Sequence, residues 1–376
     1  MKRFLSPEKI QPIPPGVYHR ASAPETVPPY RIHLRLDPGG SGILILNAAT
    51  VMHLNPTAAE YAYHFIKGTD AETAAQRVAS RYRVSRDTAL RDFRDFTSRI
   101  ETLFTTPDLD PVAYLDFDRV SPYSSGLGVP LRLDCALTYR LPGGTTAEYA
   151  PTRRVDRELT TTEWIQTLER AWQTGIPHVT FTGGEPTLRQ DLPELVRAAE
   201  ALGQVCGLLT DGLKLLDKSY RDDLLQSGLD HLLFLLQPDR SDSWAALEAI
   251  LTEDIFVTAH LTITGKNEAQ SIATLERLAS LGCTSLSLSF AEPGIPVGIL
   301  SNTASSLGLA LKFDLPVPYS TDNPVARETA QDATPEGAGV AWLYVEPDGD
   351  VLPAQGSVGR ILGNVLRDPW NKMLQA

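Results

Sequence analysis

The chain has 376 residues, of which 42% are hydrophobic and 21% charged, so it is long enough for two or three domains with sizeable cores. Its formal net charge of −12 argues against a nucleic-acid partner, because phosphate binding requires a basic surface. We find neither an apolar run near the ~20 residues that span a bilayer nor the apolar stretch of a signal peptide. We therefore expect a cytoplasmic protein without a membrane partner.

The first part of the chain predicts a proline-rich leader followed by a small domain. Residues 1–29 carry many prolines, which indicates an extended segment. From residue 30 short apolar runs separated by turns predict strands, and apolar residues at helical spacing then predict helices. The strands are expected at 30–36, 42–47 and 51–54, and the helices at 58–66, 70–82 and 86–103. Residues 30–104 thus form an α+β domain, and residues 105–129 a linker.

From residue 130 the pattern changes to apolar strands that alternate with amphipathic helices. The strands are expected at 130–137, 178–182, 205–210, 231–236, 255–263 and 284–290. This alternation predicts an α/β fold with a parallel sheet and helices outside it. Because such sheets bind ligands at the carboxyl ends of their strands, the residues that follow each strand are the candidate site.

The second of these strands leads into a turn made of Gly183, Gly184, Glu185 and Pro186. The glycines let the backbone approach a ligand closely, Glu185 offers an acceptor to a cationic group, and Pro186 stiffens the turn. With this turn in this place, residues 130–290 resemble the core of the radical S-adenosylmethionine (SAM) superfamily, a partial (β/α)6 barrel. The resemblance implies that the turn receives the amino group of SAM.

The same family carries Cys-x3-Cys-x2-Cys after its first strand, which ligates a 4Fe–4S cluster. In this chain the stretch that resembles it begins at Cys135, but Tyr139 and Pro142 stand at the other two positions. One thiolate cannot hold a cluster that needs four ligands. The resemblance therefore implies a degenerate barrel, residues 130–312, without reductive cleavage of SAM.

Residues 313–376 resemble the SPASM extension of peptide-modifying radical SAM enzymes. They contain two short apolar segments around the turn Asp348-Gly349. In that extension a cysteine that follows proline ligates an auxiliary cluster, and here this position is Ala354. The resemblance implies a winged-helix-like domain, a barrel and a degenerate extension, with no iron–sulfur cluster.

Residues 30–104 resemble the PqqD family, also called the RiPP recognition element (RiPPs are ribosomally made, post-translationally modified peptides). The strand pair, the helix that Asn55-Pro56 opens and two further helices carry this resemblance. In that family the leader of a precursor peptide adds as a strand to the small sheet and rests against the third helix. The residues implied for peptide binding are Val51, Met52, His53 and Leu54 on the strand and Arg91, Arg94 and Arg99 on the helix.

Simpler interpretations stand beside these. The glycine turn could persist only because the fold needs a tight connection there. The three arginines alternate with Asp87, Asp92 and Asp95, as on an ordinary charged helix face. A DNA-binding winged helix is the weaker interpretation of residues 30–104, because no basic stripe is present.

Our hypothesis is a pseudoenzyme of RiPP maturation. Its first domain binds a precursor peptide, and its barrel serves as a scaffold, a SAM binder or the partner of an active modifying enzyme. The alternative is a non-radical enzyme that uses SAM or a similar ligand around Glu185. A purely structural protein that binds neither SAM nor peptide is the third possibility.

Overall fold

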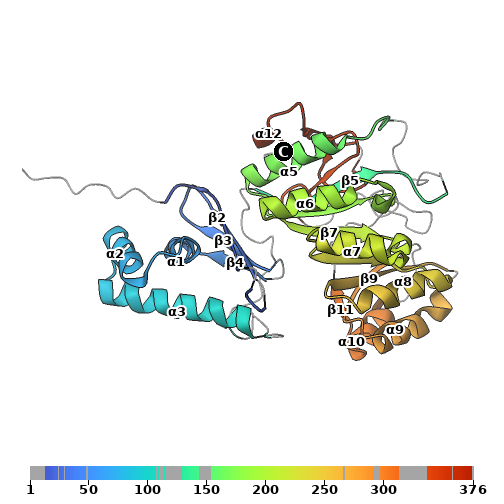
Figure 1. Ribbon diagram of the computed structural model, residues 1–376, viewed down its shortest axis with the longest axis horizontal. Helices are drawn as coiled ribbons and strands as arrows, with labels where there is room; N and C mark the ends of the chain where they lie inside the picture. Colours follow the sequence, from blue (N-terminus) through green and yellow to red (C-terminus); the bar gives the residue numbers. More distant parts are fainter. Residues whose placement is uncertain are drawn as a thin grey trace, which may run out of the picture. The chain divides into compact units, whose positions relative to one another are not determined.

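The computed structural model describes residues 13–374, apart from positions 24, 29, 48–49, 107–108, 110–113, 115–128, 144–153, 266, 291–296, 313–336 and 358. Contacts within the chain divide it into two compact units, Met1–Gly126 and Leu127–Ala376, each with its own hydrophobic core (Figure 1). Across the described residues, every helix is too short or too polar to cross a bilayer.

The N-terminal unit contains a four-stranded antiparallel sheet in the order β1-β2-β3-β4. Its strands are β1 (Gly16–Ala21), β2 (Arg31–Leu36), β3 (Gly42–Leu46) and β4 (Thr50–Leu54). Alternate residues of β2 and β3 turn toward the helices and form the core, among them Ile32, Leu34 and Leu44. Within the described strands, β4 pairs with β3 alone, so β4 is an edge of the sheet.

Three helices follow the sheet in this unit. They are α1 (Pro56–Ile66), α2 (Ala71–Arg81) and α3 (Arg86–Thr105). The side chains of Asn55, Asp70 and Ser85 each accept a hydrogen bond from a backbone amide of the first turn, which fixes where the helices begin. The core face of α3 carries Phe93 and Ile100.

Strand β1 is a correction to the sequence prediction, because it lies within the segment expected to be an extended leader. It pairs with β2 along its whole length, from Gly16 opposite Leu36 to Ala21 opposite Arg31. The ring of Tyr18 also packs edge-on against that of Tyr63, with the centroids 4.9 Å apart. Because these contacts join residues that are distant in sequence, the local pattern did not predict the strand. The prolines around it indicated an extended segment instead.

The C-terminal unit is the predicted α/β partial barrel. Its parallel strands are β5 (Arg132–Thr138), β6 (His178–Gly183), β7 (Val205–Thr210), β8 (His231–Leu235), β9 (Phe256–Ile263), β10 (Ser285–Phe290) and β11 (Ala310–Lys312). The helices between them are α5 (Thr161–Thr174), η1 (Pro186–Leu188), α6 (Leu192–Leu202), η2 (Leu213–Leu216), α7 (Lys218–Gln226), α8 (Ser241–Leu251), η3 (Glu268–Gln270), α9 (Ser271–Ser280) and α10 (Val297–Ser306). Helices α5 to α10 lie along one side of the sheet (Figure 1).

The two faces of the barrel sheet differ in polarity. The face toward the helices is apolar and includes Leu133, Phe181 and Leu208. Because side chains alternate along a strand, the residues between them turn to the inner face. There the buried side chains of β9 and β10 are polar: Thr258, His260, Thr262, Ser285, Ser287 and Ser289.

A C-terminal extension continues the sheet beyond β5. Strand β12 (Trp342–Val345) pairs in parallel with β5, and β13 (Asp350–Leu352) and β14 (Gly363–Asn364) follow antiparallel. A short helix, α12 (Trp370–Met373), lies near the end of the described chain. The predicted fold class, with a small antiparallel domain, an α/β partial barrel and an extension, is thus confirmed.

Candidate functional site

The double-glycine turn lies at the carboxyl end of β6 and is pressed against the chain that leaves β5. A Cβ atom on Gly183, whose φ is +124°, would sit 2.2 Å from the carbonyl oxygen of Thr138. A Cβ on Gly184 would sit 2.3 Å from the carbonyl oxygen of Arg140. The Gly184 amide donates to Thr138 O at 2.7 Å. Both glycines are therefore required by an internal contact, whatever else the turn does.

The carboxylate of Glu185 is buried, with 2% of the residue exposed, and is surrounded by donors from its own chain. Its Oε1 accepts from the Thr187 amide (3.0 Å), the Thr187 hydroxyl (2.6 Å) and the Thr210 hydroxyl (2.7 Å). Its Oε2 accepts from the Asp211 amide at 2.8 Å. Three donors thus surround Oε1, whereas Oε2 accepts from a backbone amide, so the carboxylate is held mainly through one of its two oxygens.

Burial, and then the neighbouring carboxylate of Asp211, raises the pKa of Glu185 to about 7. Burial also raises the pKa of Asp211. Pro186 opens η1 and is itself buried. The turn is thus held by hydrogen bonds within the chain, through both oxygens of Glu185.

The positions predicted as degenerate cluster ligands do not come together. Cys135 lies inside β5 opposite Phe181, on the apolar face toward the helices, and burial raises the pKa of its thiol well above the ordinary value. Tyr139 is the first residue after β5, and Pro142 is exposed beyond it. Ala354 is buried in the C-terminal extension.

The thiols of the chain also fail to converge. Its three cysteines lie in β5, in β7 (Cys206) and just before β10 (Cys283), and all are buried. In the described part of the chain, the one group of possible metal ligands that converges is Glu346, Asp348 and Asp350. Carboxylates suit hard cations rather than an iron–sulfur cluster, which is held by thiolates. The described residues therefore do not fit a 4Fe–4S cluster.

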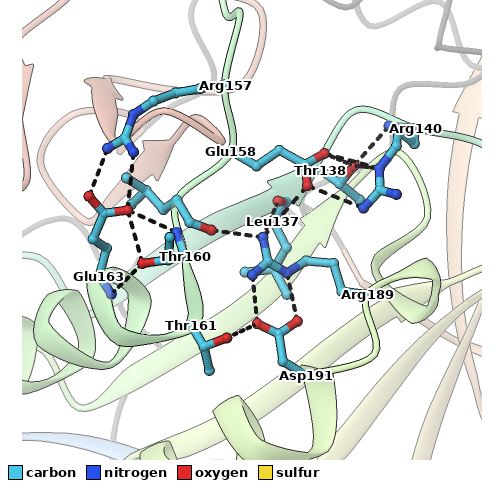
Figure 2. Close-up of polar contacts among 11 residues, drawn as sticks. Leu137, Thr138, Arg140, Arg157, Glu158, Thr160, Thr161, Glu163, Arg189 and Asp191 are labelled. Carbon is cyan, nitrogen blue, oxygen red and sulfur yellow. Dashed lines mark hydrogen bonds and ion pairs between the residues drawn. The ribbon is translucent and has the colours of Figure 1, made fainter.

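A network of charged side chains lies instead at the carboxyl end of β5 (Figure 2). At its centre is the guanidinium of Arg189, on a residue with 8% exposed surface. It donates to the backbone carbonyls of Leu137 (3.3 Å) and Leu159 (2.9 Å). It also forms two hydrogen bonds with the carboxylate of Asp191, at 2.9 and 2.6 Å. Arg189 thus joins β5 to the residues before α5 and α6.

A second arginine extends this network outward. Both oxygens of Glu158 accept from Arg140, each at 3.2 Å, and Glu158 also accepts from the hydroxyl of Thr138 (Figure 2). One Glu158 oxygen lies 3.7 Å from Arg189. None of these charged residues was among the predicted site residues. Their positions close to the ends of buried strands could have marked them as candidates. Which of them pair depends on contacts between segments that are distant in sequence.

The inner face of the barrel holds a second group that sequence reasoning missed. His260 Nδ1 lies 3.0 Å from the Ser287 hydroxyl and its Nε2 lies 3.3 Å from that of Thr262. Burial lowers the pKa of His260 to about 4, so its imidazole is neutral at physiological pH. His260 is fully enclosed, with 0% of its surface exposed. His260 and Ser287 are therefore hydrogen-bonded residues of the polar core. A substrate cannot reach them, as it would have to reach a catalytic base and nucleophile.

The residues predicted to bind peptide divide by burial. On β4, Val51 and His53 are exposed, whereas Met52 and Leu54 belong to the core. Arg91, Arg94 and Arg99 are all exposed on α3, and Arg94 lies 3.7 Å from Glu72 of α2. Half of the strand residues and all three arginines are thus available to solvent.

Comparisons with known proteins agree with this architecture. Residues 135–296 match the family model described as the Radical SAM superfamily. The fold is similar to that of Streptococcus suis SuiB bound to S-adenosylmethionine, with a TM-score of 0.60 and 16% identity over 93% of this chain and 86% of that one. SuiB bound to its precursor peptide SuiA gives a TM-score of 0.59 and 16% identity over 92% of this chain and 87% of that one.

Proposed function

We propose that this protein, whose residues 135–296 match the Radical SAM superfamily, is a pseudoenzyme of ribosomal peptide maturation, which binds a precursor peptide and performs no radical chemistry itself. The observation that carries the proposal is that the C-terminal unit has the partial barrel but no converging cluster ligands among its described residues. The barrel keeps its strands, helices and double-glycine turn, whereas the thiols that would hold a cluster are few, separated and buried.

The polar network at the end of β5 supports the metal-free part of the proposal. In the superfamily this is where cluster ligands follow the first strand. Here Thr138, Arg140 and Glu158 bond to one another, and Arg189 bonds to the backbone of β5. These groups satisfy each other and expose no thiolate or imidazole for iron.

The N-terminal unit supports the peptide-binding part. Its strand β4 has a free edge among the described strands, and a peptide can add to such an edge through main-chain hydrogen bonds. SuiB, which has a similar fold over most of this chain, has been seen with a precursor peptide bound. We propose Val51 and His53 as the exposed contacts on the strand, with Arg91, Arg94 and Arg99 as possible partners for acidic leader residues.

The barrel, in this proposal, is a scaffold that presents the bound peptide to a separate, active modifying enzyme. The internal hydrogen bonds of Glu185 support a scaffold role, because the carboxylate holds the turn to Thr210 and Asp211. The alternative is a non-radical enzyme that holds SAM or a similar ligand around Glu185.

The metal-free state is tested by anaerobic reconstitution of the full chain with iron and sulfide, followed by visible spectroscopy and calorimetric titration with SAM. We expect a colourless protein that does not cleave SAM. A 4Fe–4S absorption band together with SAM cleavage would refute the pseudoenzyme. SAM binding by colourless protein would instead make the barrel a ligand-binding domain.

Peptide binding is tested with a displayed library of 20-residue peptides, panned on the full chain, and the selected peptides are then measured by fluorescence anisotropy. We expect Val51→Asp to weaken their binding by about tenfold, because an exposed apolar contact beside the edge is lost. The matched control is Ile272→Asp on α9, since Val51 is 39% exposed and Ile272 43%. Equal binding by both variants would rule out β4 as the docking strand.

A further inference from the structure

One buried carboxylate of the C-terminal extension holds both ends of the segment that follows β5. Glu346, which directly follows β12, has 0% exposed surface. Its Oε1 accepts from the phenol of Tyr139 at 2.9 Å, across 207 positions of sequence. Its Oε2 accepts from the guanidinium of Arg154. Tyr139 begins the segment after β5 and Arg154 lies near its end, so a single side chain fixes both.

Two further contacts strengthen this arrangement, one to the extension and one between the two ends. Arg154 also reaches Asp350 of β13 at 3.3 Å. Arg140 pairs with Glu158 through two hydrogen bonds. The residues around Tyr139 and those around Arg154 are thus held together through the extension and directly by an ion pair.

The buried carboxylate of Glu346 lies beside other carboxylates and requires a cationic partner. Glu346, Asp348 and Asp350 converge closely enough to attract a cation. Burial raises the pKa of Glu346, while the hydrogen bond and charge of Arg154 act in the opposite direction. Arg154 supplies one positive charge to this group, and the guanidinium of Arg367 lies 3.4 Å from Asp350, so the chain itself provides cations beside these carboxylates.

We propose that this arrangement, the Glu346 clamp (Tyr139, Arg154, Glu346 and Asp350), replaces a metal cluster as the device that holds Tyr139, directly after the first barrel strand, and Arg154 together on the C-terminal extension. A cluster ligated from one segment would fix that segment by metal bonds, and such binding contributes folding free energy. Here two carboxylates of the extension hold Tyr139 and Arg154 by hydrogen bonds and ion pairs. The inference that the clamp replaces a cluster rests on the proposed metal-free function. The existence of the clamp rests only on the contacts described above.

Trypsin cleavage after Arg154 tests the clamp in the full chain, because the protease must bind the arginine side chain that Glu346 and Asp350 hold. We expect Glu346→Gln to speed this cleavage by about tenfold or more, since it removes the charge that pairs with Arg154. Tyr139→Phe keeps the ring and removes one hydrogen bond, so it should give a smaller increase of about threefold. Cleavage after exposed Arg83 in the other unit serves as the internal reference.

The matched control is Glu276→Gln on α9, an exposed glutamate whose replacement should leave cleavage after Arg154 unchanged. The clamp is overturned if Glu346→Gln and Tyr139→Phe are both cut at the rate of this control. If Glu346→Gln unfolds, as circular dichroism would show, Tyr139→Phe alone decides. A cluster band in the reconstituted protein would refute the metal-free function without altering these cleavage rates, so the two failures are distinguishable.

Discussion

The carboxyl ends of β5 and β6 lie side by side in the barrel, yet they match the superfamily pattern to very different degrees. At the end of β6 the Gly-Gly-Glu-Pro turn is complete, and its glycines pack against the backbone of Thr138 and Arg140. At the end of β5 the cysteine pattern is absent, and Arg140, Glu158 and Arg189 form ion pairs and hydrogen bonds.

The difference separates two kinds of constraint. Close backbone contacts at Gly183 and Gly184 tolerate no side chain, so the fold alone is enough to retain them. Cysteines that only bind metal have no such role in packing. Once the chemistry is lost, polar side chains can take their place if they satisfy one another. Retention of the turn is therefore weak support for SAM binding in this chain.

The largest expected effect concerns the backbone contact at the end of β6. Gly184→Ala would place a Cβ 2.3 Å from Arg140 O and 2.8 Å from the carbonyl carbon of Tyr139. Because both neighbours are backbone atoms, the strand ends must separate, and we expect the free energy of unfolding to fall by roughly 4 kcal/mol. Urea denaturation measures this. Gly298→Ala in α10, where a Cβ meets nothing within 4 Å, should be neutral or slightly stabilising. If the two variants gave similar denaturation curves, the close backbone contact would not explain why position 184 is glycine.

The next effect concerns the network at the end of β5. Arg189→Met would leave Asp191 and the carbonyls of Leu137 and Leu159 without their buried donor. We expect a loss of roughly 3 kcal/mol in the free energy of unfolding. Arg197→Met on α6 removes an arginine whose ion pair with Asp223 is half exposed, and should cost about 0–1 kcal/mol. Comparable losses in both variants would show that the network is an ordinary surface feature.

A pH dependence distinguishes the buried turn from the charged network. Since the pKa of Glu185 is raised to about 7, the folded protein holds a proton that the unfolded chain releases at lower pH. This contribution to stability is fully present below about pH 4.5 and is lost as the pH rises through about 7. We expect the free energy of unfolding of the wild type to fall by roughly 2 kcal/mol over this range relative to Glu185→Gln. Denaturation curves across the range measure the slope, and Glu276→Gln should keep that of the wild type. A wild-type slope in Glu185→Gln would place the titrating group elsewhere.

How far the sequence predicts this molecule depends on the range of the contacts involved. Strands and helices follow local periodicity, so the barrel, the small antiparallel domain and the extension are confirmed, whereas β1 needs its partner β2 to become visible. Cys135 is recognisable as a cysteine near a strand end, but its direction toward the helices depends on the register with β6. The pair of Tyr139 and Glu346 joins residues too far apart for any local pattern to indicate. The domain boundaries and the peptide-binding residues stay predictions.

The smallest expected effect lies in Thr182, one residue before the turn. Its hydroxyl is buried and has no hydrogen-bond partner among the described residues. Thr182→Val keeps the shape of the side chain and removes the unsatisfied group, so the free energy of unfolding should rise by about 1 kcal/mol. Thr210→Val offers the contrast, since that hydroxyl donates to Glu185 and accepts from the Gly212 amide, and its loss should destabilise the fold. Thermal denaturation of both variants shows whether the Thr182 hydroxyl is unpartnered in solution or has a hydrogen-bond partner there. If Thr182→Val is destabilising, the hydroxyl has a partner in solution, and a ligand or ordered water would then have to be sought beside a turn that we interpret as structural.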